Sequence, residues 1–356
     1  MTNADRAFPP KPVPTTGRRD HPLRRTARWP DRVAALTVLG LLVMGAGVGF
    51  LTSGVARVSA TSTTDPFAAS WDVPLSPDAT VAPDSAQLVA NLVTQYEDNY
   101  GAVHAAGGNY GGYPIVTVPA DQPLVPIEAS SGCNDFTGET GAEVPIPASA
   151  ASLVSGSGDS ALVVWQPSTD TEWEFWIATD ATGTWQACWG GEITHVSTAD
   201  PGVFPTPYGL SASGIPYLGT MITEADVESG SINHMIALQV ELGDCNGFVF
   251  PADRSDCGSA PGQVAEGQEL RFPASMAMPS GLTPFEQMVF RAIQNYGMIV
   301  TDQSGGVQVP CETDADWYAA GNTGTDPITA SWGPPGTEAY QALLGMPWSQ
   351  LQVIEP

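Results

Sequence analysis

The chain has 356 residues, enough for one large domain or two ordinary ones. It carries 38 acidic residues against 12 Lys and Arg, which gives a formal net charge of −26 at pH 7. Such an excess of negative charge opposes binding to nucleic acid and to anionic membrane surfaces, so we expect no nucleic-acid partner.

The N-terminal part of the chain differs sharply from the rest in charge. Residues 1–32 contain eight Lys and Arg, and an uncharged apolar run from Val33 to Leu51 follows them. This run is about as long as a helix that crosses a bilayer, and the basic residues before it predict a cytoplasmic N-terminus. The predicted organisation is a basic cytoplasmic segment (1–32), a transmembrane helix or signal anchor (33–54), a Ser/Thr/Pro-rich tether (55–80) and an exported domain (81–356).

Two outcomes of export stay open. Val58-Ser59-Ala60 resembles the small-residue site at which a signal peptide is cleaved. The protein is therefore expected either as a single-pass plasma-membrane protein with an extracellular domain or as a secreted protein. Beyond Ala60, three arginines stand against 35 acidic residues, a formal charge of −32, which indicates a solvated acidic surface.

The exported domain begins with a helix and continues mainly as short strands. The Pro83-Asp84-Ser85 start predicts the first helix over residues 86–96. Strands are predicted at residues 115–118, 124–127, 161–166, 232–240, 270–272, 298–301, 307–309 and 351–354. Further helices are predicted at residues 223–229, 283–296 and 337–344. Many short strands with Gly/Pro turns and few peripheral helices predict a mainly-β fold, a β-sandwich or jelly roll.

The tryptophan-rich stretch from Thr171 to His195 predicts a hairpin. Strands over 172–179 and 184–194 are rich in Trp, Phe, Ile and Thr, and they flank a turn at residues 180–183. A type I turn with a G1 bulge would pair Glu174 with Trp189. Because side chains alternate between the faces of a strand, one face would carry a carboxylate among three indoles: Glu174, Trp176, Trp185 and Trp189. The opposite face would carry Phe175 and Cys188.

All five cysteines lie in the exported part, where disulfides persist. Cys245 and Cys257 flank a loop rich in Gly, Pro and Asp, and they are the first predicted bridge. Cys133 with Cys311 is the second, which leaves Cys188 as a buried thiol. Spacing alone does not determine the connectivity.

Several segments, taken together, resemble a known family. They are WDVPL (71–75), WEFW (173–176), WQACWGG (185–191), SASGIPYLG (211–219), INHMIAL (232–238), LRF (270–272), YGMIVTD (296–302) and PWSQLQV (347–353). In this order they are similar to a family of uncharacterised exported actinobacterial proteins. The resemblance implies a concanavalin-like or jelly-roll β-sandwich, and it implies no particular activity.

The carboxylate among indoles has two interpretations, a packed core or a glycan-binding face, since indole rings stack on sugar rings. A glycosidase needs a second carboxylate roughly 5–10 Å from the first. The E-x-D-x-x-E strand of laminarinase-type glucanases does not occur here. The candidate catalytic acids are therefore Glu174 with Glu192 or Asp302 from other strands.

His234 lies on a predicted apolar strand face, where it is either a hydrogen-bonded core histidine or a general base. With Arg271 to neutralise a uronate, it would suit a polysaccharide lyase. The sequence predicts no cofactor, apart from calcium held by scattered acidic residues in loops such as 244–256.

Three hypotheses follow. The first is a membrane-tethered or secreted protein that binds, and in one version cleaves, a cell-surface or extracellular glycan through the indole face and Arg271. The second is a non-enzymatic structural or interaction protein of the cell envelope. The third is the lyase. Exposure of the three indoles separates the first two, because tryptophans of a core are shielded from water.

Overall fold

The computed structural model describes residues 66–133, 136–140, 143–154, 159–180, 183–244, 247–258 and 260–356. These residues belong to one compact unit, Ser62–Pro356. The predicted basic segment, the predicted transmembrane helix and residues 55–65 of the predicted tether lie outside the described residues. Within the described ranges, no helix is long and apolar enough to cross a membrane.

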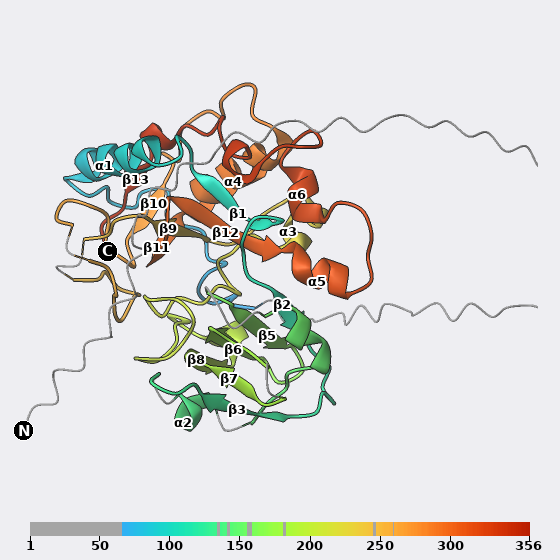
Figure 1. Cartoon of the computed structure of the whole chain (residues 1–356). Coiled ribbons are helices and arrows are strands. Elements are labelled where there is room, and N and C mark those ends of the chain that lie inside the picture. The colour runs from blue at the N-terminus through green and yellow to red at the C-terminus, as the bar shows by residue number, and fades with distance from the viewer. Residues whose placement is uncertain are drawn as a thin grey trace, which may run out of the picture. The chain divides into compact units, whose positions relative to one another are not determined.

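The described chain is built mainly from three mixed β-sheets, which confirms the mainly-β class (Figure 1). The six-stranded sheet has the order β1 (His104–Gly108), β12 (Gln308–Thr313), β9 (Ile236–Val240), β11 (Met298–Gln303), β10 (Glu269–Arg271) and β13 (Gln352–Val353). The four-stranded sheet has the order β2 (Ile115–Thr117), β5 (Leu162–Gln166), β6 (Thr171–Trp176) and β8 (Trp189–Thr194). The three-stranded sheet has the order β4 (Glu143–Val144), β3 (Val125–Ala129) and β7 (Trp185–Ala187).

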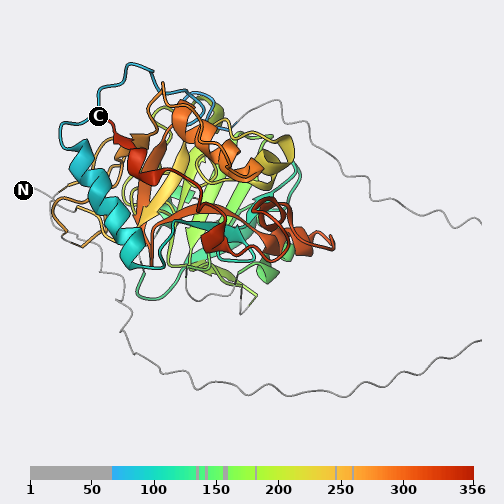
Figure 2. The ribbon, with the colours of Figure 1, turned by 90° about the horizontal axis from the view of Figure 1, so that it is seen from above.

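Helices are short and few. The α-helices are α1 (Ser85–Asp98), α2 (Thr137–Thr140), α3 (Glu224–Ser229), α4 (Pro284–Asn295), α5 (Asp314–Ala319) and α6 (Pro327–Ser331). The 3₁₀ helices are η1 (Ala148–Ser152), η2 (Val196–Thr198), η3 (Ala339–Gln341) and η4 (Trp348–Gln350). Seen from above, α1 and α4 lie in front of the sheets (Figure 2).

Three hydrophobic cores separate the layers. The helix-side core packs α1 and α4 against one face of the six-stranded sheet. The middle core lies between the six-stranded and four-stranded sheets and contains Ala237 and Ile299 from the former and Val163 and Trp165 from the latter. The outer core joins the other face of the four-stranded sheet to the three-stranded sheet. The six-stranded and four-stranded sheets therefore share the middle core, and a further core lies on the other face of each of them.

Parallel strand pairs distinguish these sheets from an antiparallel jelly roll. The pairs β1–β12, β9–β11, β2–β5 and β3–β7 are all parallel. The predicted hairpin of residues 298–301 and 307–309 is wrong, because β9 lies between β11 and β12. The turn between these two strands is short, but the central strand that separates them comes from about sixty residues earlier in the chain.

Local signals placed three helices correctly. In α4, Thr283 caps the helix, Pro284 opens it, and Glu286 completes the capping box. In α3, Thr223 caps the first turn and Gly230 ends the helix at φ +76°. The first predicted helix corresponds to α1, but the predicted helix at 337–344 is only the 3₁₀ turn η3.

Part of the predicted tether belongs to the folded domain. Phe67 is fully buried and Trp71 is 3% exposed, both in the middle core. The indole Nε1 of Trp71 donates to the carbonyl of Gly202 at 3.0 Å. The boundary between tether and domain therefore lies before residue 66 rather than at residue 80.

The tryptophan-rich hairpin has a different register from the predicted one. In the β6–β8 pair, Trp176 lies opposite Trp189 and Glu174 opposite Gly191, a shift of two residues. A two-residue shift keeps every side chain on its face, so Glu174, Trp176 and Trp189 still share one face.

Trp185, however, is on the opposite side of the sheet from the predicted one. The chain has a left-handed residue at Ile177 (φ +53°), and β7 leaves β6 to pair with β3. Trp185 then packs in the outer core with Trp173 and Phe175. The predicted face of three indoles is therefore wrong in one of its members.

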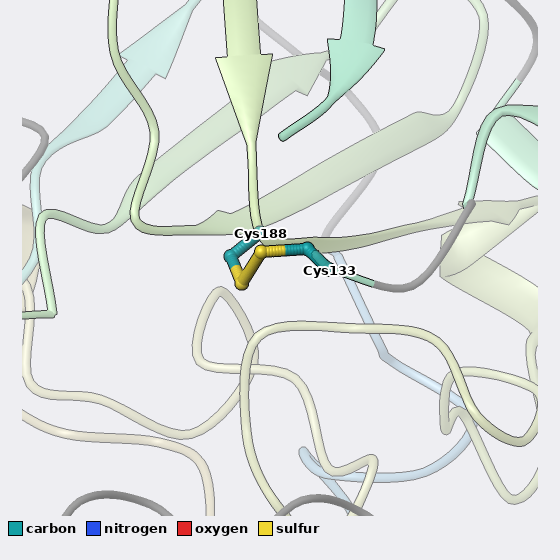
Figure 3. Close-up of a disulfide and its surroundings, with 2 residues drawn as sticks. All are labelled: Cys133 and Cys188. Carbon is teal, nitrogen blue, oxygen red and sulfur yellow. A yellow bond between two sulfur atoms is a disulfide. The ribbon is translucent and has the colours of Figure 1, made fainter. Parts of the chain in front are cut away.

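The disulfide prediction also needs correction. Cys133 bonds to Cys188, and Cys311 is a free, buried thiol in β12 (Figure 3). The parallel pairing of β3 with β7 places the segment after β3 beside the residue after β7, so that these two cysteines meet. Cys257 is disulfide-bonded, and its predicted partner Cys245 lies outside the described residues.

Candidate functional site

Glu174 is a core residue and not a cleft residue. It has no exposed surface, and its Oε1 accepts the backbone N–H groups of Tyr217 and Leu218 at 2.6 and 2.9 Å. Burial raises the pKa of Glu174 to about 8, although these two hydrogen bonds lower it. A side chain closed off from water in this way cannot reach a polymer, so Glu174 does not qualify as a catalytic acid.

A second glutamate is buried beside it. Glu172 lies on the same face of β6, between Trp165 and Ile193 of the neighbouring strands. Neither carboxyl oxygen of Glu172 has a hydrogen-bond partner among the described residues. Burial, followed by the charge of Glu174, raises the pKa of Glu172 well above its ordinary value.

The candidate second acids do not complete a glycosidase pair. Glu192 lies opposite Trp173 and accepts its indole N–H at 2.7 Å, which places it on the other face of the sheet from Glu174. Asp302 is 6% exposed in β11, where its Oδ1 accepts the backbone N–H of Gln303. Glu192 and Glu174 therefore lie on different faces, and Glu174 and Asp302 are both shielded from water, so neither predicted pair is presented to a polymer.

The candidate sugar-binding indoles are largely shielded. Trp185 is 5% exposed and Trp189 is 8% exposed, and the Trp189 indole donates to the carbonyl of Pro207 at 2.6 Å. Trp176 is half-buried and donates to Asp159 Oδ1 at 3.0 Å. By the exposure criterion, Trp185 and Trp189 are packing residues, whereas Trp176 is shielded only in part.

His234 lies before β9 and pairs with a carboxylate that the sequence analysis missed. Its Nδ1 is 2.8 Å from the Met235 carbonyl and its Nε2 is 3.2 Å from Asp226 Oδ2. Burial lowers the pKa of His234, but the hydrogen bond and charge of Asp226 outweigh burial and raise it overall. Because both ring nitrogens face acceptors, the surroundings favour the imidazolium form, and a protonated ring cannot act as a general base.

Arg271 is also committed to the fold. Its two terminal nitrogens donate to the carbonyls of Ser76 and Pro77 at 2.5 and 2.8 Å. These bonds hold the segment before α1 against β10. Arg271 as a whole is 4% exposed, so its guanidinium is not presented to a uronate.

Three carboxylates form the group that is best suited to a cation. Donor oxygens of Asp256, Glu266 and Asp302 all lie within 4.8 Å of one another. Oxygen ligands of this kind suit a hard cation such as Ca²⁺, and Asp256 closes the loop in which calcium was predicted. Arg254, itself 4% exposed, interacts electrostatically with Glu266 and Asp302 and so already supplies positive charge here.

An open cleft lies elsewhere, between the six-stranded and four-stranded sheets. It has a volume of about 300 Å³. We call it the Tyr113 cleft, and its polar and aromatic lining consists of Tyr110, Tyr113, Asp159, Ser160, Gln239, Gln308 and Thr313.

A glycine-rich loop, residues 107–112, forms one wall of the Tyr113 cleft. A side chain on Gly107 would lie 2.3 Å from the Cys311 Cβ, and one on Gly112 would lie 2.4 Å from the Cys311 carbonyl oxygen. Gly112 also has φ +80°, which favours glycine. The glycines therefore let the loop pack directly on β12, and this packing holds Tyr110 and Tyr113 at the cleft.

Uncharged groups form a hydrogen-bond network at the base of the cleft. The Gln239 amide donates to the hydroxyls of Tyr113 and Tyr217 at 2.8 and 2.6 Å, and Gln308 donates to Gln239 Oε1 at 2.5 Å. Burial, followed by the charges of Asp159 and Asp302, raises the pKa of Tyr113. Tyr113 therefore keeps its proton, and its hydroxyl is hydrogen-bonded to the Tyr217 side chain as well as to Gln239.

The sequence analysis missed this cleft. Its polar residues come from the glycine-rich loop, β9, β12 and the segment before β5, which only the sheet topology brings together. One available signal was the glycine pairs around Tyr110, since paired glycines mark close backbone approach.

Comparisons with protein-family models, with curated proteins and with solved structures found no match.

Proposed function

We propose that this protein is an exported or membrane-tethered protein that binds a neutral glycan in the Tyr113 cleft. The observation that carries the proposal is the network of Gln308, Gln239 and Tyr113 at the base of an open cleft. Sugar hydroxyls both donate and accept hydrogen bonds. Amide and phenol groups match them without the cost of burying a charge.

Charge further narrows the ligand class. Of the residues that the structure describes, no Lys or Arg lines the cleft, and Asp159 lies at its wall. A carboxylate accepts hydrogen bonds from sugar hydroxyls but repels uronates and phosphates. The proposed ligand is therefore an uncharged hexose unit, and the glycan hypothesis moves from the tryptophan face to this cleft.

The export predicted from the sequence agrees with this proposal, because the ligand would be a cell-surface or extracellular polysaccharide. The disulfide between Cys133 and Cys188 fits an oxidising compartment. The proposal uses one part of the β-sandwich prediction. The six-stranded and four-stranded sheets pack on a common core, and the cleft lies between them.

Calorimetric titration of the full-length protein with neutral gluco- and manno-oligosaccharides tests the proposal. Gln308→Ala and Asp159→Asn should each weaken binding about fivefold. Gln308→Ala removes a hydrogen bond and Asp159→Asn replaces one acceptor oxygen by a donor, and each change costs about 1 kcal/mol. Gln352→Ala is the matched control, because Gln352 is a half-buried glutamine in the same sheet that does not line the cleft. Equal affinities for the unmodified protein and the three variants, or no binding of any sugar in the panel, would contradict the proposal.

The second candidate is a non-enzymatic structural or interaction protein of the cell envelope. The low exposure of Trp185 and Trp189 favours it, because core tryptophans stabilise a scaffold without taking part in binding. It predicts normal stability and no sugar response, so the same titrations distinguish the two functions.

A further inference from the structure

Three exposed tyrosines surround a buried histidine beside the cleft. The exposed fractions of Tyr100, Tyr110 and Tyr340 are 64%, 45% and 45%. Their ring centroids lie 4.7, 5.7 and 6.4 Å from the ring of His104, which is 4% exposed. We call these three residues the tyrosine platform.

The grouping of these rings is unusual for a surface. The large exposed hydrophobic residues of the described chain include four tyrosines, and only Tyr318 lies outside the platform. Single exposed aromatic residues are ordinary, whereas a cluster of them marks a binding surface. Packing on His104 fixes the rings without covering them.

The end of α1 positions Tyr100. Tyr100 follows the C-cap residue Asn99, and its φ is +75°. The N–H of Gly101 then donates to the Tyr96 carbonyl at 2.8 Å, which is a common way for a helix to end. This helix end holds the Tyr100 ring against His104 and leaves Tyr100 64% exposed.

The platform is continuous with the Tyr113 cleft. Tyr110 belongs to both, because it lines the cleft and contacts His104. Among the described residues, neither the platform nor the cleft lining contains Lys or Arg, so both surfaces lack a group that would bind an anionic ligand. Tyrosine rings offer flat apolar faces, which stack on the apolar faces of pyranose rings.

We propose that the tyrosine platform extends the cleft into a site for a neutral hexose oligosaccharide several units long. This inference rests on the proposed function: the cleft binds one sugar unit and the platform stacks the units that follow it. Affinity should therefore increase with chain length, and the increase should depend on Tyr100 and Tyr340.

Titration of the full-length protein with matched disaccharides and hexasaccharides of glucose and mannose tests this inference. Tyr340→Ala should weaken hexasaccharide binding about threefold to tenfold and leave disaccharide binding unchanged. Tyr340→Phe should restore the affinity, because the ring and not the hydroxyl stacks on the sugar. Tyr318→Ala is the matched control, with 47% exposure outside the platform, and thermal unfolding confirms that each variant is folded.

The outcomes separate the two proposals. If Gln308→Ala weakens binding of both lengths but Tyr340→Ala changes neither, the platform inference is wrong and the cleft proposal stands. If Tyr340→Ala weakens hexasaccharide binding but Gln308→Ala has no effect, the cleft proposal is wrong and the platform is the site. Absence of binding by every sugar contradicts both.

Discussion

Replacing one buried carboxyl should change how the stability of this protein depends on pH. Glu174 is fully buried, and its pKa rises from 4.5 to about 8 on folding. Between these two values the unfolded chain loses the proton and the folded chain keeps it. Unfolding then releases a proton, so the free energy of unfolding falls as pH rises, by about 1.4 kcal/mol per pH unit at most.

The variant Glu174→Gln keeps an oxygen that can accept the Tyr217 and Leu218 N–H groups but cannot ionise. Between pH 5 and pH 8 the unmodified protein should lose about 4 kcal/mol more stability than the variant does, as an upper bound. Glu172 should maintain part of the slope in the variant, because burial alone raises its pKa. The two proteins are compared by how much the free energy of unfolding changes with pH. A destabilisation by the new amide that is the same at every pH therefore does not affect the comparison.

Urea unfolding at pH 5, 6, 7 and 8 without reductant measures this effect, because the disulfide must stay intact. Glu228→Gln is the control: water solvates this exposed α3 carboxyl in both the folded and the unfolded chain, so its removal should preserve the slope. Identical pH slopes for Glu174→Gln and the unmodified protein would refute the reasoning, since they would mean that the buried carboxyl is already ionised in the fold.

Three further predictions concern stability. Serine at both Cys133 and Cys188 should lower the free energy of unfolding by about 2–4 kcal/mol, measured by urea unfolding, because a bridge across 55 residues is lost. Gly112→Ala should cost at least about 2 kcal/mol, while Gly111→Ala, also at positive φ but with open space around it, should cost about 1 kcal/mol; thermal unfolding compares them. His234→Asn should destabilise the protein more at pH 5 than at pH 9. Because folding raises the pKa of His234, its pair with Asp226 stabilises the fold fully below about pH 6.5, the ordinary pKa of histidine. This stabilisation decreases as the pH rises through the pKa of His234 in the folded protein. Equal destabilisation at both pH values would contradict the imidazolium assignment.

Local sequence signals determined three helices of this protein, α1, α3 and α4. The capping box of Thr283 and Glu286 and the terminating Gly230 involve residues within a few positions of one another. Their interactions form within one or two turns of the chain, so residue type and spacing predict them. The positions of most strands and the face shared by Glu174 and Trp176 could be predicted for the same reason, since alternation within a strand is local.

Tertiary structure alone decided how the strands are ordered and where the candidate site lies. β9 enters between β11 and β12, and β7 leaves its hairpin partner for β3, so Trp185 changes face and Cys133 meets Cys188. The Tyr113 cleft depends on two hydrogen bonds of Gln239, which donates to Tyr113, 126 positions away in the chain, and accepts from Gln308, 69 positions away. Contacts at such separations arise from competition among whole strands for partners and buried surface. No short segment encodes that competition, so it is settled only when the complete sheets form.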